Sequence, residues 1–457
     1  MIGIKKAAFE DKGRGQVCVY DKFCLFEGTG NGVLVAKKSE NCDCRDGAIR
    51  TGIGIEKYLT VAGTGIERIT QKDVRGFQIF RYPSEDGSYL VEKVGFTNGG
   101  GIFYLFNEEG NTVQIAVSPG LQVRAVTAFL VNAPTEACAV VAGTDGVYAL
   151  SLSAGDSVTL FDDGSRAICQ CRNRVFLGRK GNVLYYSDLL VPWDFTESID
   201  GAGKIQLPNE YGALVMLQTF RENVYAFFER GIMRLDVAGS AREFRLSVLP
   251  YSGENIFGDS VGTVGKYMIF LAENGLYRTD GKTVERICEN LPIQPIREGQ
   301  VCGQAVFLGR YAVWYTDVNG EAKQVVVVEG GESGYFSAVL DGLGGDGGKA
   351  LCRYKAVAYE ATAHGDLPDD AEYRFETGAL DFGRTGFKTL RTLRFEGEGS
   401  FVLGVQCDGR STETELEFSD GVAVAEICER GEEFSFVFLL DNGAEIRKME
   451  AEVLFAS

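Results

Sequence analysis

Histidine is the scarcest of the residue types in this chain that could perform acid–base or nucleophilic chemistry. The only histidine, His364, lies in the stretch ATAHGDLPDD, whose polar composition is typical of a solvated loop. A Ser-His-Asp or Cys-His system needs a histidine to accept the proton of the nucleophile, so such a system could only use His364. We therefore expect no catalytic residue of this kind.

Paired carboxylates are the second route to chemistry, because glycoside hydrolysis needs two of them. Asp188, Asp194 and Asp200 lie close together in sequence. The chain holds 64 acidic residues, however, so close pairs arise by chance, and the S-x-D-x-G-x-x-W phrase that sialidases repeat is absent. The glycine-rich stretches at 28–32 and 97–102 are followed by neither Lys-Ser/Thr nor a helix, which favours turns over a phosphate site. We predict a protein that is not an enzyme and has no cofactor.

Cysteine is abundant but is not spaced for metal binding. Twelve cysteines are scattered along 457 residues, and two C-x-C pairs, Cys42/Cys44 and Cys169/Cys171, would each point to one face of a strand. No C-x-x-C motif accompanies them. We interpret the cysteines as buried, reduced thiols that act as small apolar side chains, and we predict no metal site.

The net charge of −18 argues against a protein that reads nucleic-acid sequence, because an acidic chain repels phosphate. The N-terminal stretch lacks the apolar region of a secretory signal. No apolar run approaches the ~18–20 residues of a membrane span. We expect a protein made in the cytoplasm, without a membrane span.

Four phrases share one pattern, in which an apolar run, a polar turn with glycine and an alternating run follow one another. They are AVVAGTDGVYALSL (139–152), RVFLGRKGNVLYYSD (174–188), VYAFFERGIMRLDV (224–237) and YMIFLAENGLYRTDG (267–281). Their glycines, Gly146, Gly181, Gly231 and Gly275, recur at intervals of 35, 50 and 44 residues. The Asp-Gly at 145–146 and the Asn-Gly at 274–275 accept positive φ at both central positions of a hairpin turn.

A hairpin that recurs at such intervals is the signature of a β-propeller, in which each blade is a four-stranded sheet. The stretch from Val17 to about Gly330 has room for seven blades, and six to eight are compatible with the spacing. The alternative is a pair of stacked β-sandwiches, which rarely repeat one hairpin phrase so often.

The pattern changes after the glycine-rich segment Ala338–Ala350, which we interpret as a linker or a long loop. Its two aspartates, Asp341 and Asp346, do not have the spacing of a calcium loop. Short alternating strands separated by Gly- and Asp-containing turns follow, which predicts one antiparallel β-sandwich of jelly-roll type. We expect an all-β chain with a propeller domain at 1–345 and a C-terminal sandwich at 346–457.

Several phrases, taken in order, resemble the propeller proteins of bacteriophage tails. In LGRKGNVLYYSDLLVPWDFTE the matching residues are Tyr186, Ser187, Asp188, Pro192 and Trp193. The other matching segments are Asn41–Tyr58, Phe257–Gly281 and Glu376–Phe401.

The resemblance is to the tail nozzle or hub of short-tailed phages, and it spans about 41–401. It implies a structural virion protein without a catalytic residue. It also implies a ring, expected to be a hexamer, below the portal and adaptor, through which double-stranded DNA leaves without sequence-specific binding. The alternatives are a carbohydrate-binding or glycan-cleaving propeller, in which Trp193 would stack on a sugar, and a cytosolic interaction scaffold.

The tail phrase also has a physical interpretation. Pro192 cannot donate a ladder hydrogen bond and should end strand pairing. Trp193 offers an apolar face that could cover the seam between blades. Asp188 and Asp194 are suited to accept hydrogen bonds from turn amides.

Overall fold

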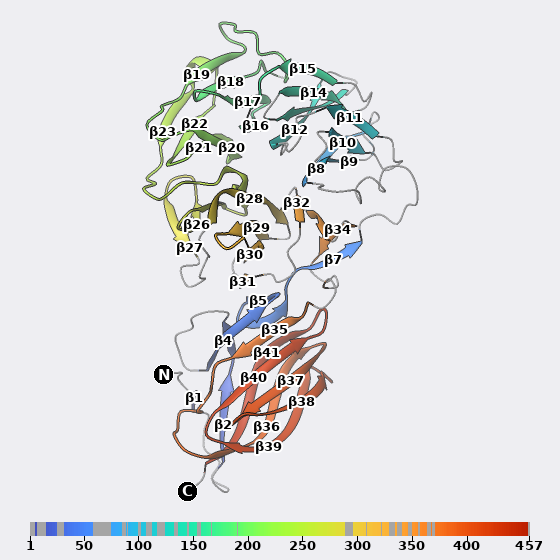
Figure 1. Cartoon of the computed structure of the whole chain (residues 1–457), viewed down its shortest axis with the longest axis vertical. Coiled ribbons are helices and arrows are strands. Elements are labelled where there is room, and N and C mark those ends of the chain that lie inside the picture. The colour runs from blue at the N-terminus through green and yellow to red at the C-terminus, as the bar shows by residue number, and fades with distance from the viewer. Residues whose placement is uncertain are drawn as a thin grey trace.

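The chain folds into two β modules, a ring of sheets and a sandwich, in this computed structural model (Figure 1). The structure describes residues 5–6, 15–24, 32–57, 75–84, 88, 90–98, 102–106, 112–116, 124–131, 136–143, 146–152, 157–165, 167–189, 191–287, 296–307, 309–320, 322–328, 334–335, 341–345, 350–354, 357–362, 367 and 371–455. His364, Asp145 and Asp346 lie outside these residues.

Seven four-stranded antiparallel sheets, counted over the described residues, form the ring, and each is one blade of a β-propeller (Figure 1). The first strands of neighbouring blades lie side by side at its centre. From first to fourth strand, blades one to three are β8 (Arg75–Pro83), β9 (Leu90–Asn98), β10 (Ile102–Phe106), β11 (Thr112–Ala116); β12 (Arg124–Val131), β13 (Glu136–Ala142), β14 (Val147–Ser151), β15 (Ser157–Phe161); and β16 (Ala167–Cys171), β17 (Arg174–Arg179), β18 (Val183–Tyr186), β19 (Gly203–Gln206). The sequence prediction of a propeller with about seven blades is confirmed.

Blades four to seven continue in the same order around the ring. They are β20 (Leu214–Phe220), β21 (Asn223–Phe228), β22 (Gly231–Asp236), β23 (Arg245–Val248); β24 (Gly262–Val264), β25 (Tyr267–Ala272), β26 (Gly275–Thr279), β27 (Val284–Ile287); β28 (Ile296–Phe307), β29 (Arg310–Asp317), β30 (Ala322–Val328), β31 (Gly334–Tyr335); and β32 (Asp341–Gly345), β33 (Ala350–Tyr354), β34 (Val357–Thr362), β7 (Gly54–Lys57). Two 3-10 turns, η1 (Ala241–Glu243) and η2 (Gly258–Ser260), lie between these strands. No helix among the described residues is long and apolar enough to cross a membrane.

The four repeated phrases are the middle hairpins of blades two to five. A middle strand has neighbours on both edges and packs against a blade on each face, so both faces favour apolar residues. The second strands β21 and β25 are accordingly buried at five of their six positions. This burial explains why these hairpins are the clearest signal in the sequence.

The sandwich consists of two sheets that enclose one large core (Figure 1). The seven-stranded sheet contains β1 (Lys5–Lys6), β2 (Gly15–Tyr20), β41 (Glu445–Phe455), β36 (Lys388–Glu398), β39 (Val422–Gly431), β5 (Cys42–Arg45) and β6 (Ala48–Thr51). The six-stranded sheet contains, in order, β3 (Lys22–Cys24), β4 (Val33–Glu40), β35 (Tyr373–Thr377), β40 (Phe434–Leu440), β37 (Ser400–Cys407) and β38 (Arg410–Glu417). The orders β41-β36-β39 and β35-β40-β37-β38 are those of a jelly roll, as the sequence predicts.

The predicted domain boundary at residue 345 does not agree with the strand pairing. Strand β2 pairs with β41, and β4 pairs with β35, so the described strands before Gly54 belong to the sandwich. Strand β7 pairs with β34 and completes blade seven, so the propeller runs from Gly54 to Thr362 as an insertion in the sandwich. Local sequence patterns miss this arrangement because partners far apart in sequence form these pairs.

The glycine-rich segment predicted as a linker contains β32, the first strand of blade seven. Strand β32 lies between β8 and β28 near the ring centre, where strands from neighbouring blades approach closely. Glycine suits such a position because it has no side chain to displace a neighbouring backbone. The prediction of a linker is therefore wrong for 341–345, because these glycines form the inner strand of blade seven.

A buried ion pair joins the two modules. Arg310 at the start of β29 places Nη2 2.7 Å from Asp43 Oδ2 in β5, and both side chains are less than one-tenth exposed. Leu367 packs against the sandwich core and against the apolar cluster of blades six and seven. The modules therefore share a desolvated junction in addition to the chain connections.

Candidate functional site: the loop of the third blade

The connection from β18 to β19 is a loop over residues 187–202 that carries the tail phrase. It lies on the part of the ring remote from the sandwich (Figure 1). Leu189, Trp193 and Ile199 are large apolar residues of this loop with exposed side chains. The loop is thus an irregular segment that presents apolar groups at the surface.

Arg174, a buried arginine at the start of β17, holds this loop. Its Nη1 donates hydrogen bonds to the carbonyl oxygens of Ser187 (2.6 Å) and Gly201 (3.0 Å), and Nη2 donates to that of Asp200 (3.4 Å). Asp188 Oδ1 lies 3.9 Å from the guanidinium. One cation therefore binds both ends of the loop, which the planar fork of an arginine can do and a lysine cannot.

Turn hydrogen bonds fix the first half of the loop, as the sequence predicts for its aspartates. Asp188 Oδ1 accepts the amide of Leu189 (2.6 Å), and Asp194 Oδ1 accepts that of Thr196 (2.9 Å). The buried hydroxyl of Ser187 accepts the amide of Val175 (2.9 Å) on the neighbouring strand. These side chains therefore have structural tasks within the loop.

The aromatic contact at the seam between blades two and three is made by Phe195. Its ring lies 5.2 Å from that of Phe161, on the outer strand of blade two, and the Arg179 guanidinium lies 4.3 Å from the Phe161 ring centre. Trp193 keeps 38% of its surface exposed. Pro192 lies in the turn after Val191, which forms an isolated antiparallel bridge with Asp188.

Each candidate carboxylate of the loop has a polar partner within the protein. Asp200 forms an ion pair with Arg242, in which both side chains are largely exposed. Asp188 and Asp194 accept the turn amides described above. Across the described residues, no group of three or more His, Cys, Asp or Glu side chains is placed to hold a metal ion.

Asn182 is a structural residue that the sequence analysis missed. It is buried in the β17–β18 turn with φ 59°, and its Nδ2 donates toward the carbonyl oxygens of Pro208 (3.1 Å) and Gly212 (2.9 Å) and toward Asn209 Oδ1 (3.0 Å). Its Oδ1 accepts the amide of Leu214 (2.8 Å) at the start of β20. Asn182 therefore fastens blade three to the chain entering blade four. The available signal was the Gly-Asn dipeptide, since asparagine tolerates positive φ.

The four predicted turn glycines take different places. Gly181 lies in its turn with φ 77°. Gly231 and Gly275 begin the strands after two-residue turns, and Gly146 immediately precedes β14. The prediction of positive φ at both residues of 274–275 is wrong, because positive φ occurs only at Gly275. A side chain on Gly231 would meet the ring of Tyr211 at 2.5 Å, which explains glycine there.

In the propeller, two-residue turns with positive φ at both residues occur instead at Arg172-Asn173 and Arg221-Glu222, between the first two strands of blades three and four. Arg172 also donates to Glu222 Oε2 (2.7 Å) of the next blade. These turns escaped prediction because neither contains glycine.

Both C-x-C pairs are buried, as expected. Ten cysteines with described side chains form no disulfide; nine of them are buried, and Cys428 is exposed. Burial raises the pKa of Cys169 to about 12 and that of Cys171 to about 11. These thiols are therefore neutral near pH 7 and pack as apolar groups.

With blades, sandwich and loop in place, the protein is a seven-bladed β-propeller inserted in a jelly roll. No family model and no curated protein matches the chain. Among solved structures, a catalytically inactive virginiamycin B lyase from Staphylococcus aureus in complex with quinupristin is 12% identical; the match covers 68% of this chain and 98% of that one, with a TM-score of 0.45. BamB from Moraxella catarrhalis is 11% identical; the match covers 71% and 92%, with a TM-score of 0.40.

Proposed function

We propose that this chain is a structural, non-enzymatic component of a bacteriophage tail, a nozzle or hub protein that forms a ring of six copies below the portal and adaptor. The order of the tail-like phrases along the chain is the observation that carries the proposal. Tyr186–Trp193 spans the end of β18 and its loop, Phe257–Gly281 spans the first three strands of blade five, and Glu376–Phe401 enters the jelly roll. The phrases thus coincide with separate parts of both modules.

Hydrogen bonds between neighbouring blades at the ring centre support a structural role for the protein. Gln218 Nε2 in blade four donates to Thr263 Oγ1 in blade five (3.1 Å). Thr219 Oγ1 donates to the Gln170 carbonyl oxygen of blade three. These neutral groups bind neighbouring blades to one another, which stiffens the ring. Together with the buried Arg310–Asp43 pair, they suit a protein that transmits load rather than one that opens and closes.

The charge of the chain suits a conduit for DNA. Each copy has a net charge of −18, so a ring of six would be strongly negative overall, and a wall lined with its carboxylates would repel phosphate. DNA would gain no counterion release from such a wall and would pass without being retained. We expect double-stranded DNA to bind the purified protein no more tightly than it binds serum albumin at 50 mM salt.

Assembly tests the proposal. Multi-angle light scattering and negative-stain microscopy of the purified chain, alone and mixed with the portal and adaptor proteins encoded beside its gene, should reveal a ring of about six copies. A strictly monomeric chain in every mixture would refute the ring. A gene without portal, terminase or capsid neighbours would favour a cytosolic scaffold. A hit on a glycan array or in a hydrolase screen would favour the carbohydrate alternative, with Trp193 as the first residue to replace.

A further inference from the structure

Strand β38 is an open edge of the six-stranded sheet. It pairs with β37 over eight residues in unbroken antiparallel register, and no described strand pairs with its other side. Seven of its eight residues are exposed. It contains no proline, glycine or bulge, which are features that prevent edge strands from pairing with other chains. Its outer backbone groups can therefore pair with one further strand.

Three glutamates, Glu413, Glu415 and Glu417, occupy alternate positions of β38 and so share the outward face of the sheet. Leu416, on the other face, packs against the sandwich core. The residues opposite the glutamates on β37 are Gly404, Val402 and Ser400, none of which is charged. Within the described part of the chain, no cation forms an ion pair with any of the three glutamates.

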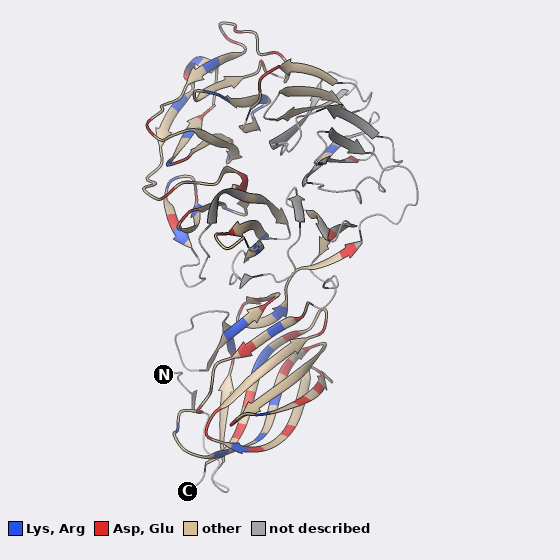
Figure 2. Ribbon diagram, viewed as in Figure 1, with Lys and Arg blue, Asp and Glu red and all other residues tan. Residues whose placement is uncertain are grey.

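On the opposite sheet of the same sandwich, basic and acidic residues of the paired strands β36 and β41 lie side by side (Figure 2). Lys448 Nζ lies 2.9 Å from Glu396 and 2.8 Å from Glu450, and Arg391 lies 3.7 Å from Glu452. Neighbouring strands there supply the cations. The row of glutamates on β38 therefore differs from the ion-paired glutamates of β36 and β41.

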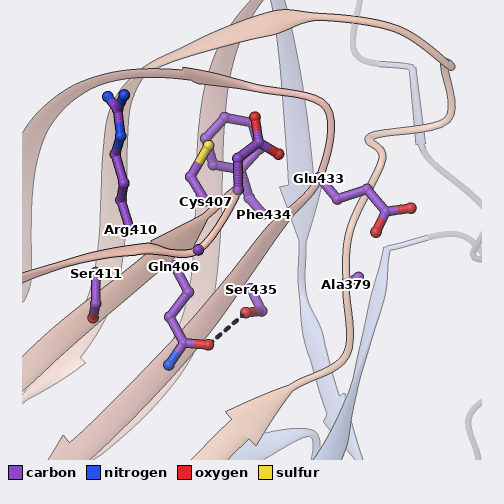
Figure 3. Close-up of a pocket in the computed structure, with 10 residues that line it drawn as sticks. Ala379, Gln406, Cys407, Arg410, Ser411, Glu433, Phe434 and Ser435 are labelled. Atoms are coloured by element: carbon purple, nitrogen blue, oxygen red, sulfur yellow. Dashed lines mark hydrogen bonds between the residues drawn. The ribbon is translucent and has the colours of Figure 1, made fainter.

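A pocket of about 460 Å³ opens at the beginning of β38 (Figure 3). Its polar lining includes Gln406, Asp408, Arg410, Ser411, Glu433 and Ser435. The side chains of Glu433 and Arg410 extend away from one another, and Ser435 Oγ donates to Gln406 Oε1 (3.2 Å) (Figure 3). Two carboxylates against one guanidinium leave the pocket with an excess of negative charge, in line with the glutamate row.

We propose that β38 and this pocket bind an extended segment of another protein that carries lysine or arginine at alternate positions. Main-chain hydrogen bonds to the outer edge of β38 would hold the segment as an added strand. Side chains directly opposite on paired strands have Cβ atoms about 4.5–5.5 Å apart, so each basic residue would meet one glutamate. A further basic side chain would enter the pocket beside Asp408 and Glu433.

A second copy of this chain fits the edge less well. Antiparallel pairing of two β38 strands keeps the outward faces together, so odd-numbered residues lie opposite odd-numbered residues. Centred registers then place Glu413 opposite Glu415, or a glutamate opposite itself, and like charges directly opposite are destabilising. The charge pattern thus selects a basic partner. The inference does not depend on the proposed tail function.

Binding of two synthetic peptides to the full chain tests the proposal. Fluorescence anisotropy at 50 mM salt would compare KTKTKTKT with KKKKTTTT, which has the same composition and charge. We expect the alternating peptide to bind at least tenfold more tightly, because only its lysines match the spacing of the glutamates. Equal affinity, or no binding of either peptide, would overturn the proposal.

Matched variants locate the site. Glu413→Gln/Glu415→Gln/Glu417→Gln should lower the affinity of the alternating peptide at least tenfold. Glu396→Gln/Glu450→Gln/Glu452→Gln changes the net charge equally on the opposite sheet and should leave the affinity within twofold. Hydrogen exchange should show peptide-induced protection at 410–417 and none at 422–431. An equal loss in both variants, protection elsewhere, or dimerisation through β38 in light scattering would each contradict the proposed occupant.

Discussion

Replacing Arg174 with methionine should release the loop of residues 187–202 while leaving the blades folded. The change removes the donor of three hydrogen bonds, and two of them, to the carbonyl oxygens of Ser187 and Gly201, are buried. A buried acceptor left without a donor costs about 1–3 kcal/mol, and water cannot replace the donor while the loop stays closed. The free energy of loop opening should therefore fall by about 3 kcal/mol.

Hydrogen exchange followed by mass spectrometry measures this opening directly. A loss of about 3 kcal/mol corresponds to amide exchange about 100-fold faster across 187–202, since ~1.4 kcal/mol is a factor of ten. Arg172→Met is the matched control, because its ion pair with Glu222 is exposed and such pairs contribute about 0–1 kcal/mol. Loop exchange that is the same in Arg174→Met as in the wild-type chain would refute the assignment of Arg174 as the residue that closes the loop.

Three further changes test the blade, the junction and the thiols. Asn182→Ala should lower the free energy of unfolding, measured by urea titration, by about 3 kcal/mol, because the side-chain hydrogen bonds are lost. Asn182→Gly should be destabilised by more than half of that amount, because glycine restores only the backbone freedom. A glycine variant as stable as the wild-type chain would show that the side-chain hydrogen bonds contribute little. Arg310→Met should cost about 3–5 kcal/mol because the buried Asp43 carboxylate loses this cation, and Asp43→Asn should also destabilise the fold. The double variant should cost less than the sum of the two, whereas additive losses would show that the pair is not coupled. Iodoacetamide at pH 8 should modify Cys428 and spare the nine buried cysteines, since burial raises the pKa of Cys169 to about 12; modification of the folded core would contradict this. Because an unfolded thiol ionises near ~8.5, these raised pKa values stabilise the fold below that pH, and the contribution should decline as the pH rises toward 12.

The propeller hairpins were predictable because their signal is local. A middle strand such as β25 is buried at five of six positions, and a short polar turn separates it from its partner. Composition over a dozen residues is enough to recognise such a unit. The jelly-roll strands after residue 371 were readable for the same reason, since inward and outward positions alternate along them.

The domain boundaries were not predictable because they depend on distant pairs. Gly54 pairs with Thr362, and Gly15 pairs with Leu454, so nothing near β7 or β2 indicates the module to which it belongs. The position of β32 was hidden by its glycines, which resemble a linker unless the crowding at the ring centre is known.

The candidate site was predicted in part. The roles of Asp188 and Asp194 follow from the turn chemistry of aspartate, and the structure confirms them. The role of Arg174 does not follow from sequence, because an arginine beginning an apolar strand gives no indication of which carbonyl oxygens it will meet. The exposed Trp193 and the partly buried Phe195 lie two residues apart, and the path of the loop alone determines which of them contacts blade two.

The insertion of the propeller within the sandwich determines how the molecule would respond to stretching. Strands β2 and β41 are antiparallel neighbours with Gly15 opposite Leu454, so tension applied near the two chain ends would separate this pair one rung at a time, like a zipper. The ring, attached farther inside the chain, would bear no tension until the surrounding jelly roll had come apart.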